Sequence, residues 1–196
     1  NTGVMGTFSP SNKVSPDIEK RIYDEVLLPT LKGLIAEGIE FKGVLYAGLM
    51  IDGDDLRVLE YNARFGDPET QVILPRLATD LFEIFEACID GTLDKVDIKW
   101  TGDSAVCVVL ASGGYPEKYE KGKKITFGDL DDGVIVFHAG TAFDADGDIV
   151  TSGGRVLGVT ALAPTLKEAR DKAYANAKRI TFDKVHYRTD ILKELG

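Results

Sequence analysis

Apolar residues in the first half of the chain recur at helical spacing in some stretches and form short continuous runs in others. A helical pattern opens at Ser15 and Pro16 and stops at Gly38, and Pro29 inside it should kink or divide the helix because proline lacks an N–H. Two apolar runs joined by an Asp-Gly turn indicate a β-hairpin. The pattern therefore predicts helices over residues 16–37, 69–77 and 81–89, the last ending at Gly91, and strands over residues 43–51 and 56–62.

The second half of the chain carries shorter apolar runs, separated by turns that contain Gly or Asp. We expect a small antiparallel sheet or a flattened barrel, with strands over residues 105–111, 124–127, 134–139, 148–151 and 155–162. Thr165 and Glu168 have the spacing of a capping box, which predicts a helix to about residue 179 that packs on the sheet. Because residues 91–103 are polar and rich in turns, we predict an α+β chain with domains over residues 1–98 and 99–196.

Composition and charge narrow the range of partners. With 196 residues, 44% of them hydrophobic, the chain can bury a core. A net charge of −9 and a pI near 4.8 argue against a nucleic acid or a membrane surface as partner, since both attract basic faces. Cys88 and Cys107 lie in apolar runs without the spacing of a zinc site, so we expect reduced core thiols.

The pattern also predicts where the protein resides. No apolar run is long enough to span a membrane, and no stretch has the form of a signal peptide, so we expect a cytoplasmic protein. The chain opens on Asn1 rather than Met, and we therefore expect it to be part of a longer protein.

Polar chemistry is concentrated at the end of the second hairpin strand and in the loop that follows, over residues 58–71. Because a strand has a period of two residues, Glu60 and Asn62 share one face, with Arg64 beyond them. A carboxylate and an amide oxygen suit Mg²⁺, which keeps its other positions for water and nucleotide phosphates. Arg64 is placed to bind phosphate or carboxylate. The spacing alone fits a solvated strand end equally well.

Three other stretches offer weaker candidates. Gly3 and Gly6 lie in an opening segment expected to be a loop, where they would let the backbone approach an anion, although a plain turn explains them as well. Asp67 is either a ligand or the N-cap of the next helix, with the following proline at its first position. Arg155 follows a Gly-Gly pair, where a backbone nest and a guanidinium could bind a phosphate, or where a surface Arg simply follows a turn.

Six segments of specific sequence occur in order along the chain. They are Asn-Thr-Gly-x-Met-Gly at 1–6, Leu-Tyr-Ala-Gly-Leu-Met-Ile at 45–51, Glu-Tyr-Asn-Ala-Arg-Phe-Gly-Asp-Pro-Glu-Thr-Gln at 60–71, Ala-Ser-Gly-Gly-Tyr-Pro at 111–116, Phe-His-Ala-Gly-Thr at 137–141 and Gly-Gly-Arg-Val-Leu at 153–157. Together they resemble the phosphoribosylamine–glycine ligase family of ATP-grasp enzymes in purine biosynthesis. The resemblance covers the whole chain and implies the second half of an ATP-grasp domain, followed by a small β-rich carboxy-terminal domain with a packing helix.

The resemblance also implies an activity and the residues that carry it. In this family ATP phosphorylates glycine to glycyl phosphate, which the amine of 5-phosphoribosylamine then attacks. By resemblance Glu60 and Asn62 carry Mg²⁺ or Mn²⁺ between the ATP phosphates, and Arg64 and Asp67 act as catalytic residues near the acyl phosphate. The expected substrate-binding residues are Asn1, Thr2, Gly3, Gly6, Asp67, Glu69 and Arg155.

Two features depart from the family pattern. The family's opening usually reads Asn-Thr-Gly-Gly-Met-Gly, and Val4 replaces the second Gly of the pair, which would be strained if that position needs φ > 0. Many ATP-grasp enzymes take an acidic metal ligand from the preceding strand, and residues 43–51 offer none.

The resemblance places an amino-terminal half, with the lobe that clamps adenine, ahead of the first residue of this chain. That missing half is therefore an expected partner, and the isolated chain is expected to be inactive. Two alternatives remain beside the glycine ligase: a catalytically silent folded fragment, and another ATP-grasp carboxylate–amine ligase.

Overall fold

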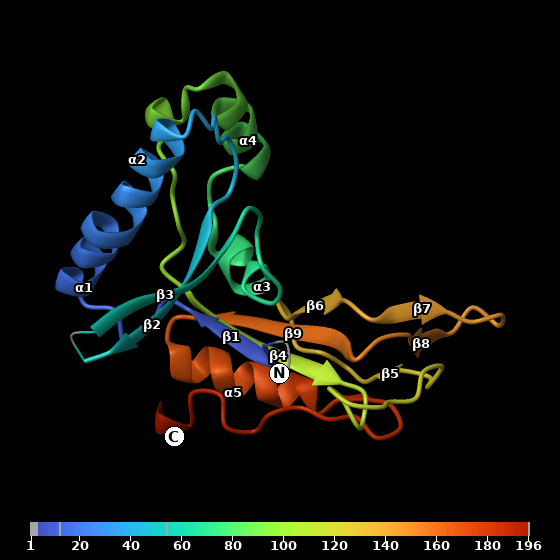
Figure 1. Cartoon of the computed structure of the whole chain (residues 1–196). Helices are drawn as coiled ribbons and strands as arrows, with labels where there is room; N and C mark the ends of the chain where they lie inside the picture. The colour runs from blue at the N-terminus through green and yellow to red at the C-terminus, as the bar shows by residue number, and fades with distance from the viewer. Residues whose placement is uncertain (1–3, 12, 54, 196) are drawn as a thin grey trace. The chain divides into compact units, whose positions relative to one another are not determined.

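The computed structural model describes residues 4–11, 13–53 and 55–195 of the chain. Their contacts form two compact units, both drawn in Figure 1. The sheet unit comprises residues 1–10, 67–78 and 100–196, and the hairpin unit comprises residues 11–66 and 79–99. This division differs from the predicted domains over 1–98 and 99–196, because residues 1–10 and 67–78 belong to the same unit as the carboxy-terminal part.

The sheet unit is built on four antiparallel strands in the order β1-β4-β9-β6 (Figure 1). Their bounds are β1 (Gly6–Ser9), β4 (Ser104–Ala111), β9 (Arg155–Ala163) and β6 (Ile135–His138). The predicted small antiparallel sheet is confirmed, and β1 corrects the expectation that the opening segment is a loop throughout. Four residues at the start of the chain become a strand because β4 offers them an edge, with Gly6 opposite Val108.

The core of the sheet unit lies on both faces of β4. Helix α5 (Leu166–Ala177) covers one face, where Val106, Val108 and Leu110 pack with alanines of the helix. On the other face, Cys107 packs with Val72 of the short helix α3 (Thr70–Ile73). All eight residues of β4 are buried, which explains why its sequence is a continuous apolar run rather than an alternating one.

The capping box that predicts α5 is confirmed. The Glu168 backbone N–H donates to Thr165 Oγ1 at 3.2 Å, and the Thr165 backbone N–H donates to Glu168 Oε2 at 3.2 Å. The unit also contains two pairs of short strands, β5 (Thr126–Phe127) with β10 (Ile180–Thr181) and β7 (Thr141–Phe143) with β8 (Ile149–Thr151). A 3-10 turn, η4 (Lys193–Leu195), lies near its carboxy-terminal end. The sequence pattern predicts neither β7 nor β10.

The helix predicted over residues 69–77 is shorter than expected. It consists of α3 and the 3-10 turn η2 (Leu74–Arg76), and Pro75 at the start of that turn interrupts the α-helical hydrogen bonds. The proposed N-cap role of Asp67 is wrong, because the helix begins after Glu69 and has no side-chain cap. The carboxylate of Asp67 binds Arg155 instead.

The hairpin unit opens with a continuous helical stretch formed by α1 (Pro16–Arg21), the π-helical turn η1 (Ile22–Leu27) and α2 (Leu28–Ala36). Ser15 Oγ caps α1 by accepting from the Ile18 N–H at 3.2 Å. Just before Pro29 the backbone widens, and the Leu28 N–H donates to Tyr23 O, five residues back. The predicted division at Pro29 therefore takes the form of a π turn within one helical stretch.

The predicted hairpin is confirmed as β2 (Tyr46–Asp52) and β3 (Asp55–Asn62). Helix α4 (Leu81–Asp90) is also confirmed, with Asp80 at its N-cap and Gly91 at φ 70° after its last residue, followed by the turn η3 (Leu93–Lys95). None of the helices in the described part of the chain is long and apolar enough to cross a membrane.

Candidate functional site

The hairpin places Glu60 and Asn62 side by side, as the two-residue period predicts. Asn62 Nδ2 donates a hydrogen bond to Glu60 Oε1 at 3.2 Å. Glu60 lies opposite Gly48 on the neighbouring strand, and a Cβ at Gly48 would lie 3.0 Å from Glu60 Cγ and 3.8 Å from Oε1. The absence of a side chain at Gly48 therefore leaves the space that the Glu60 side chain occupies.

The donor set of this pair is one carboxylate and one amide, both hard-oxygen ligands. Across residues 4–11, 13–53 and 55–195, no group of three or more His, Cys, Asp or Glu side chains is arranged to hold a metal ion. A divalent ion bound by Glu60 and Asn62 could take further ligands from water or from a bound phosphate. This is how Mg²⁺ commonly binds in enzymes that use nucleotides, so the pair fits the predicted ion.

Arg64 follows the pair in the same unit. Its side chain is exposed, and its Nη1 donates to the backbone oxygen of Phe65 at 3.1 Å. Within the described ranges this is the hydrogen bond of its guanidinium, and the predicted role in binding a phosphate or carboxylate stays a prediction.

In the sheet unit, Asp67 and Arg155 meet although 88 residues separate them. Arg155 Nη2 donates to Asp67 Oδ2 at 3.0 Å, and Nη1 donates to the backbone oxygens of Asp67 at 2.9 Å and Val4 at 3.2 Å. Gln71 Nε2 donates to the other carboxylate oxygen of Asp67 at 2.7 Å. Both oxygens of the Asp67 carboxylate therefore have donors from the protein itself.

The opening segment is positioned by packing. A Cβ at Gly6 would lie 2.1 Å from Ile191 Cδ1 and 2.9 Å from the backbone oxygen of Cys107, so the strand needs glycine here to pair with β4 beneath the carboxy-terminal segment. The φ of Val4 depends on Gly3, which lies outside the described residues. The strain expected at Val4 if that position needs φ > 0 therefore stays a prediction. The candidates Asn1, Thr2 and Gly3 lie outside the described residues.

The structure also shows where Glu69 and the Gly-Gly pair before Arg155 lie. Glu69 is half-buried at the start of α3, where its backbone oxygen accepts from the N–H groups of Val72 and Ile73. Before Arg155, the Gly153 N–H donates to Gly140 O at 3.2 Å, so that N–H is not free to join an anion-binding nest. A Cβ at Gly154 would lie 2.3 Å from Tyr115 Cδ2, which shows that this glycine is required by close packing.

The two cysteines are free thiols, as predicted. Cys107 is fully buried in the core, and this burial raises the pKa of its thiol to about 11. Cys88 is only half-buried, so the prediction of a core position is correct for Cys107 alone.

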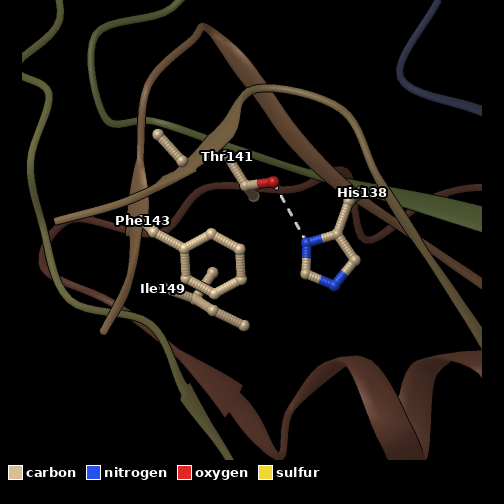
Figure 2. Close-up of a pocket in the computed structure, with 5 residues that line it drawn as sticks. His138, Thr141, Phe143 and Ile149 are labelled. Carbon is tan, nitrogen blue, oxygen red and sulfur yellow. Dashed lines mark hydrogen bonds between the residues drawn. The ribbon is translucent and has the colours of Figure 1, made fainter. Parts of the chain in front are cut away.

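A separate pocket of about 310 Å³ lies between β6 and the β7–β8 hairpin (Figure 2). Its lining includes His138, Phe143 and Ile149, and His138 Nδ1 is 3.0 Å from Thr141 Oγ1. Among the described residues, sequence reasoning missed Gly48 and Gln71 as supports of candidate site residues. Gly48 had no signal in the sequence, because a regular register from the turn would place it opposite Leu59, and only a shift between Gly48 and Leu49 brings it opposite Glu60.

Comparison with known proteins agrees with this geometry. Residues 1–70 match the model described as "Phosphoribosylglycinamide synthetase, ATP-grasp (A) domain", and residues 105–194 match the one described as "Phosphoribosylglycinamide synthetase, C domain". The chain belongs to the phosphoribosylglycinamide synthetase family. The predicted α+β fold, with an ATP-grasp part followed by a small carboxy-terminal part, is confirmed.

Individual relatives of the synthetase family support the same assignment. The chain is 48% identical to the phosphoribosylamine–glycine ligase of Caldanaerobacter subterraneus over 191 residues, which are 97% of this chain and 46% of the relative. It is 50% identical to the ligase of Vibrio parahaemolyticus over 194 residues, which are 97% of this chain and 45% of that relative. The chain thus spans about half the length of the curated relatives it matches.

Solved structures match the synthetase chain as well. The crystal structure of phosphoribosylamine–glycine ligase from Thermotoga maritima has a TM-score of 0.85 and 41% identity, and the match covers 97% of this chain and 47% of that one. Pyruvate carboxylase from Rhizobium etli matches with a TM-score of 0.66 at 18% identity, over 97% of this chain and 20% of that one. This second likeness concerns the fold alone.

Proposed function

We propose that this chain is the metal-binding half of an ATP-dependent ligase that joins glycine to 5-phosphoribosylamine and forms glycinamide ribonucleotide, ADP and phosphate. The observation that carries the proposal is the Glu60–Asn62 pair, with Glu60 opposite Gly48, in a chain of the synthetase family. The proposed partner is an amino-terminal half that supplies the adenine pocket, since this chain spans about half of its relatives.

The proposed chemistry needs the γ-phosphoryl group of ATP in line with the glycine carboxylate, so that glycyl phosphate forms. Glu60 and Asn62 would hold Mg²⁺ or Mn²⁺, which neutralises phosphate charge when bound. Arg64 would donate hydrogen bonds to the phosphoryl oxygens, where negative charge is spread in the transition state. In the sheet unit, Asp67, Glu69 and the opening segment are the proposed substrate-binding residues.

We further propose that the reaction takes place in the cytoplasm. The support is that both cysteines are free and that the proposed substrates are charged metabolites that do not partition into membranes.

The test is to complete the enzyme. The chain is fused behind the amino-terminal half of the Caldanaerobacter ligase, which is 48% identical in the part that it would replace, and ADP release is measured with glycine, 5-phosphoribosylamine and Mg²⁺. We expect the completed enzyme to turn over and the isolated chain to be inactive, because one wall of the site cannot exclude water from an acyl phosphate. Robust turnover by the isolated chain would contradict the assignment of the nucleotide lobe to the missing half.

Variants and substrates sharpen this test. Glu60→Ala and Asn62→Ala in the completed enzyme should abolish Mg²⁺-dependent turnover while thermal stability changes little, since Glu60 is exposed and Asn62 only half-buried. Near-normal turnover by either variant at limiting Mg²⁺ would overturn the metal assignment. If turnover requires a carboxylate other than glycine, the chain instead serves a different ATP-grasp ligase.

A further inference from the structure

The contacts of Arg155 join three parts of the sheet unit that are far apart in the sequence. Arg155 is the first residue of β9. Its guanidinium donates to the opening segment at Val4 O, and to the loop before α3 at both the backbone oxygen and the carboxylate of Asp67. A second link joins the same two segments, because Thr7 Oγ1 donates to Pro68 O at 3.0 Å. The opening segment and the loop are thus held together from β9.

Most of the hydrogen-bonding capacity of the Arg155 guanidinium is used within the protein. Three of its five N–H groups donate to protein oxygens, and its side chain is 24% exposed. The Asp67 side chain is more accessible, at 52% exposed, and its two carboxylate oxygens accept from Arg155 and Gln71. The geometry is that of a bidentate clamp on the loop, rather than of a cation directed at solvent.

Gln71 completes the arrangement. Its Nε2 donates to Asp67 Oδ1, while its Oε1 is buried and has no hydrogen-bond partner in the described part of the chain. A buried acceptor without a donor is unfavourable, so an apolar side chain of similar length would fill this place more stably. Of the polar contacts that the structure describes, the bond to Asp67 is the one that an apolar side chain would lose.

We propose that Arg155 is a positioning residue: it fixes the Asp67 loop and the opening segment in register, and it acts on the proposed ligase reaction through them rather than by binding the ribose phosphate. Gln71 supports the same loop from its other side. This inference rests on the proposed function for its kinetic consequences, and it replaces the sequence-based expectation that Arg155 is a phosphate ligand. A displacement of about 1 Å at a reacting group is enough to lower a rate by roughly 100-fold.

The kinetic test uses Arg155→Gln, Asp67→Asn and the double variant in the completed enzyme. We expect each single change to lower kcat by roughly 10- to 100-fold, and the double change to lower it no further than the worse single change, since both break one clamp. Arg155→Lys should recover little of kcat, because an ammonium keeps the charge but cannot donate to Asp67 and Val4 at once. A phosphate ligand would behave differently: Arg155→Gln would raise KM for 5-phosphoribosylamine selectively and leave kcat unchanged.

The matched control is Arg188→Gln. Arg188 forms a two-pronged pair with Asp190 in the same unit, with distances of 2.8 and 2.7 Å, and in the described part of the chain its side chain donates to neither the opening segment nor the Asp67 loop. We expect this variant to keep the parent kcat and KM. Equal losses in Arg155→Gln and Arg188→Gln would overturn the proposal, because they would report a general effect of breaking an ion pair.

Hydrogen exchange separates this inference from the proposed function. In the 196-residue chain, Arg155→Gln should speed amide exchange at residues 4–8 and 65–73, and Arg188→Gln should leave those amides unchanged. Unchanged exchange in Arg155→Gln would refute the clamp, whatever the kinetics show. If the completed enzyme has no ligase activity while the exchange pattern appears, the proposed function fails and the clamp stands.

Discussion

Single residues in this protein owe their roles to neighbours on other strands. Gly48 is a plain strand residue in the sequence, yet its missing Cβ makes room for the side chain of Glu60. Gly6 was expected to let an anion approach, and the structure gives it a packing reason beneath Ile191. Asp67 could have capped a helix, but it forms an ion pair with Arg155. In each case the residue type was informative, and its partner decided its role.

The first prediction concerns Gly48. A methyl group added at this position would contact Glu60 Cγ at 3.0 Å, so Gly48→Ala should displace the carboxylate without removing any ligand. In the completed enzyme we expect the Mg²⁺ concentration for half-maximal activity to rise roughly 10-fold, as for other changes that misplace a metal ligand. Gly102→Ala is the control, because a Cβ there meets nothing within 4 Å. An unchanged Mg²⁺ requirement in Gly48→Ala would argue against Glu60 as a ligand.

At the scale of elements, the loop before β6 depends on α5. Asn176 on the helix is fully buried, accepts from the Asp131 N–H at 2.8 Å and donates to Asp131 Oδ2 at 3.0 Å. Arg179 Nη1 donates to the other carboxylate oxygen at 2.6 Å. One carboxylate thus joins the loop to the end of the helix.

The second prediction concerns how the stability contributed by the Asp131 carboxylate depends on pH. The hydrogen bond from Arg179, and after it the one from Asn176, holds the pKa of Asp131 below its usual value of 3.8. Because the folded-state pKa is lowered, the ionised carboxylate stabilises the fold above that pH, and the stabilisation is lost as the pH falls through the folded-state value. Melting temperatures of parent and Asp131→Asn should therefore differ most near neutral pH and converge in acid. A difference that is equal at every pH would show that the charge contributes nothing.

At the scale of the whole molecule, the two units differ in how much apolar surface they bury. Among the described residues, the hairpin unit buries only Val26 and Ala87 of its hydrophobic side chains, whereas the three core clusters all lie in the sheet unit. The large hydrophobic residues of the hairpin unit that remain exposed are Val14, Tyr23, Leu27, Leu31, Ile35, Ile39, Met50, Val58, Leu59, Tyr61, Phe82, Phe85, Ile89, Leu93 and Ile98. A unit with so small a core gains little from hydrophobic burial.

The third prediction follows from this difference. In the isolated chain, amides of α1, α2 and α4 should exchange at least about 10-fold faster than those of β4, β9 and α5, because few buried contacts oppose local unfolding. In the completed enzyme we expect the hairpin unit to gain protection, since the amino-terminal half would cover its apolar residues. Equal protection of both units in the isolated chain would show that the hairpin unit is stable without a partner.

The sequence by itself determined the elements whose signals are local. The capping box of α5, the Gly91 stop of α4 and the β2–β3 hairpin could all be predicted, because each depends on hydrogen bonds between residues close in the chain. The two-residue period placed Glu60 and Asn62 on one face for the same reason. Six segments in order also indicated the family.

Only the tertiary structure decided the features that depend on distant partners. β1 is a strand because β4 accepts it about a hundred residues further along the chain, and four residues are too few to show a period of their own. Asp67 has a local option as a helix cap, but Arg155 offers two charge-assisted hydrogen bonds once β9 is in place. A residue's nearest neighbours in sequence can encode a turn or a cap, whereas its partner across a sheet is fixed only when the chain has folded.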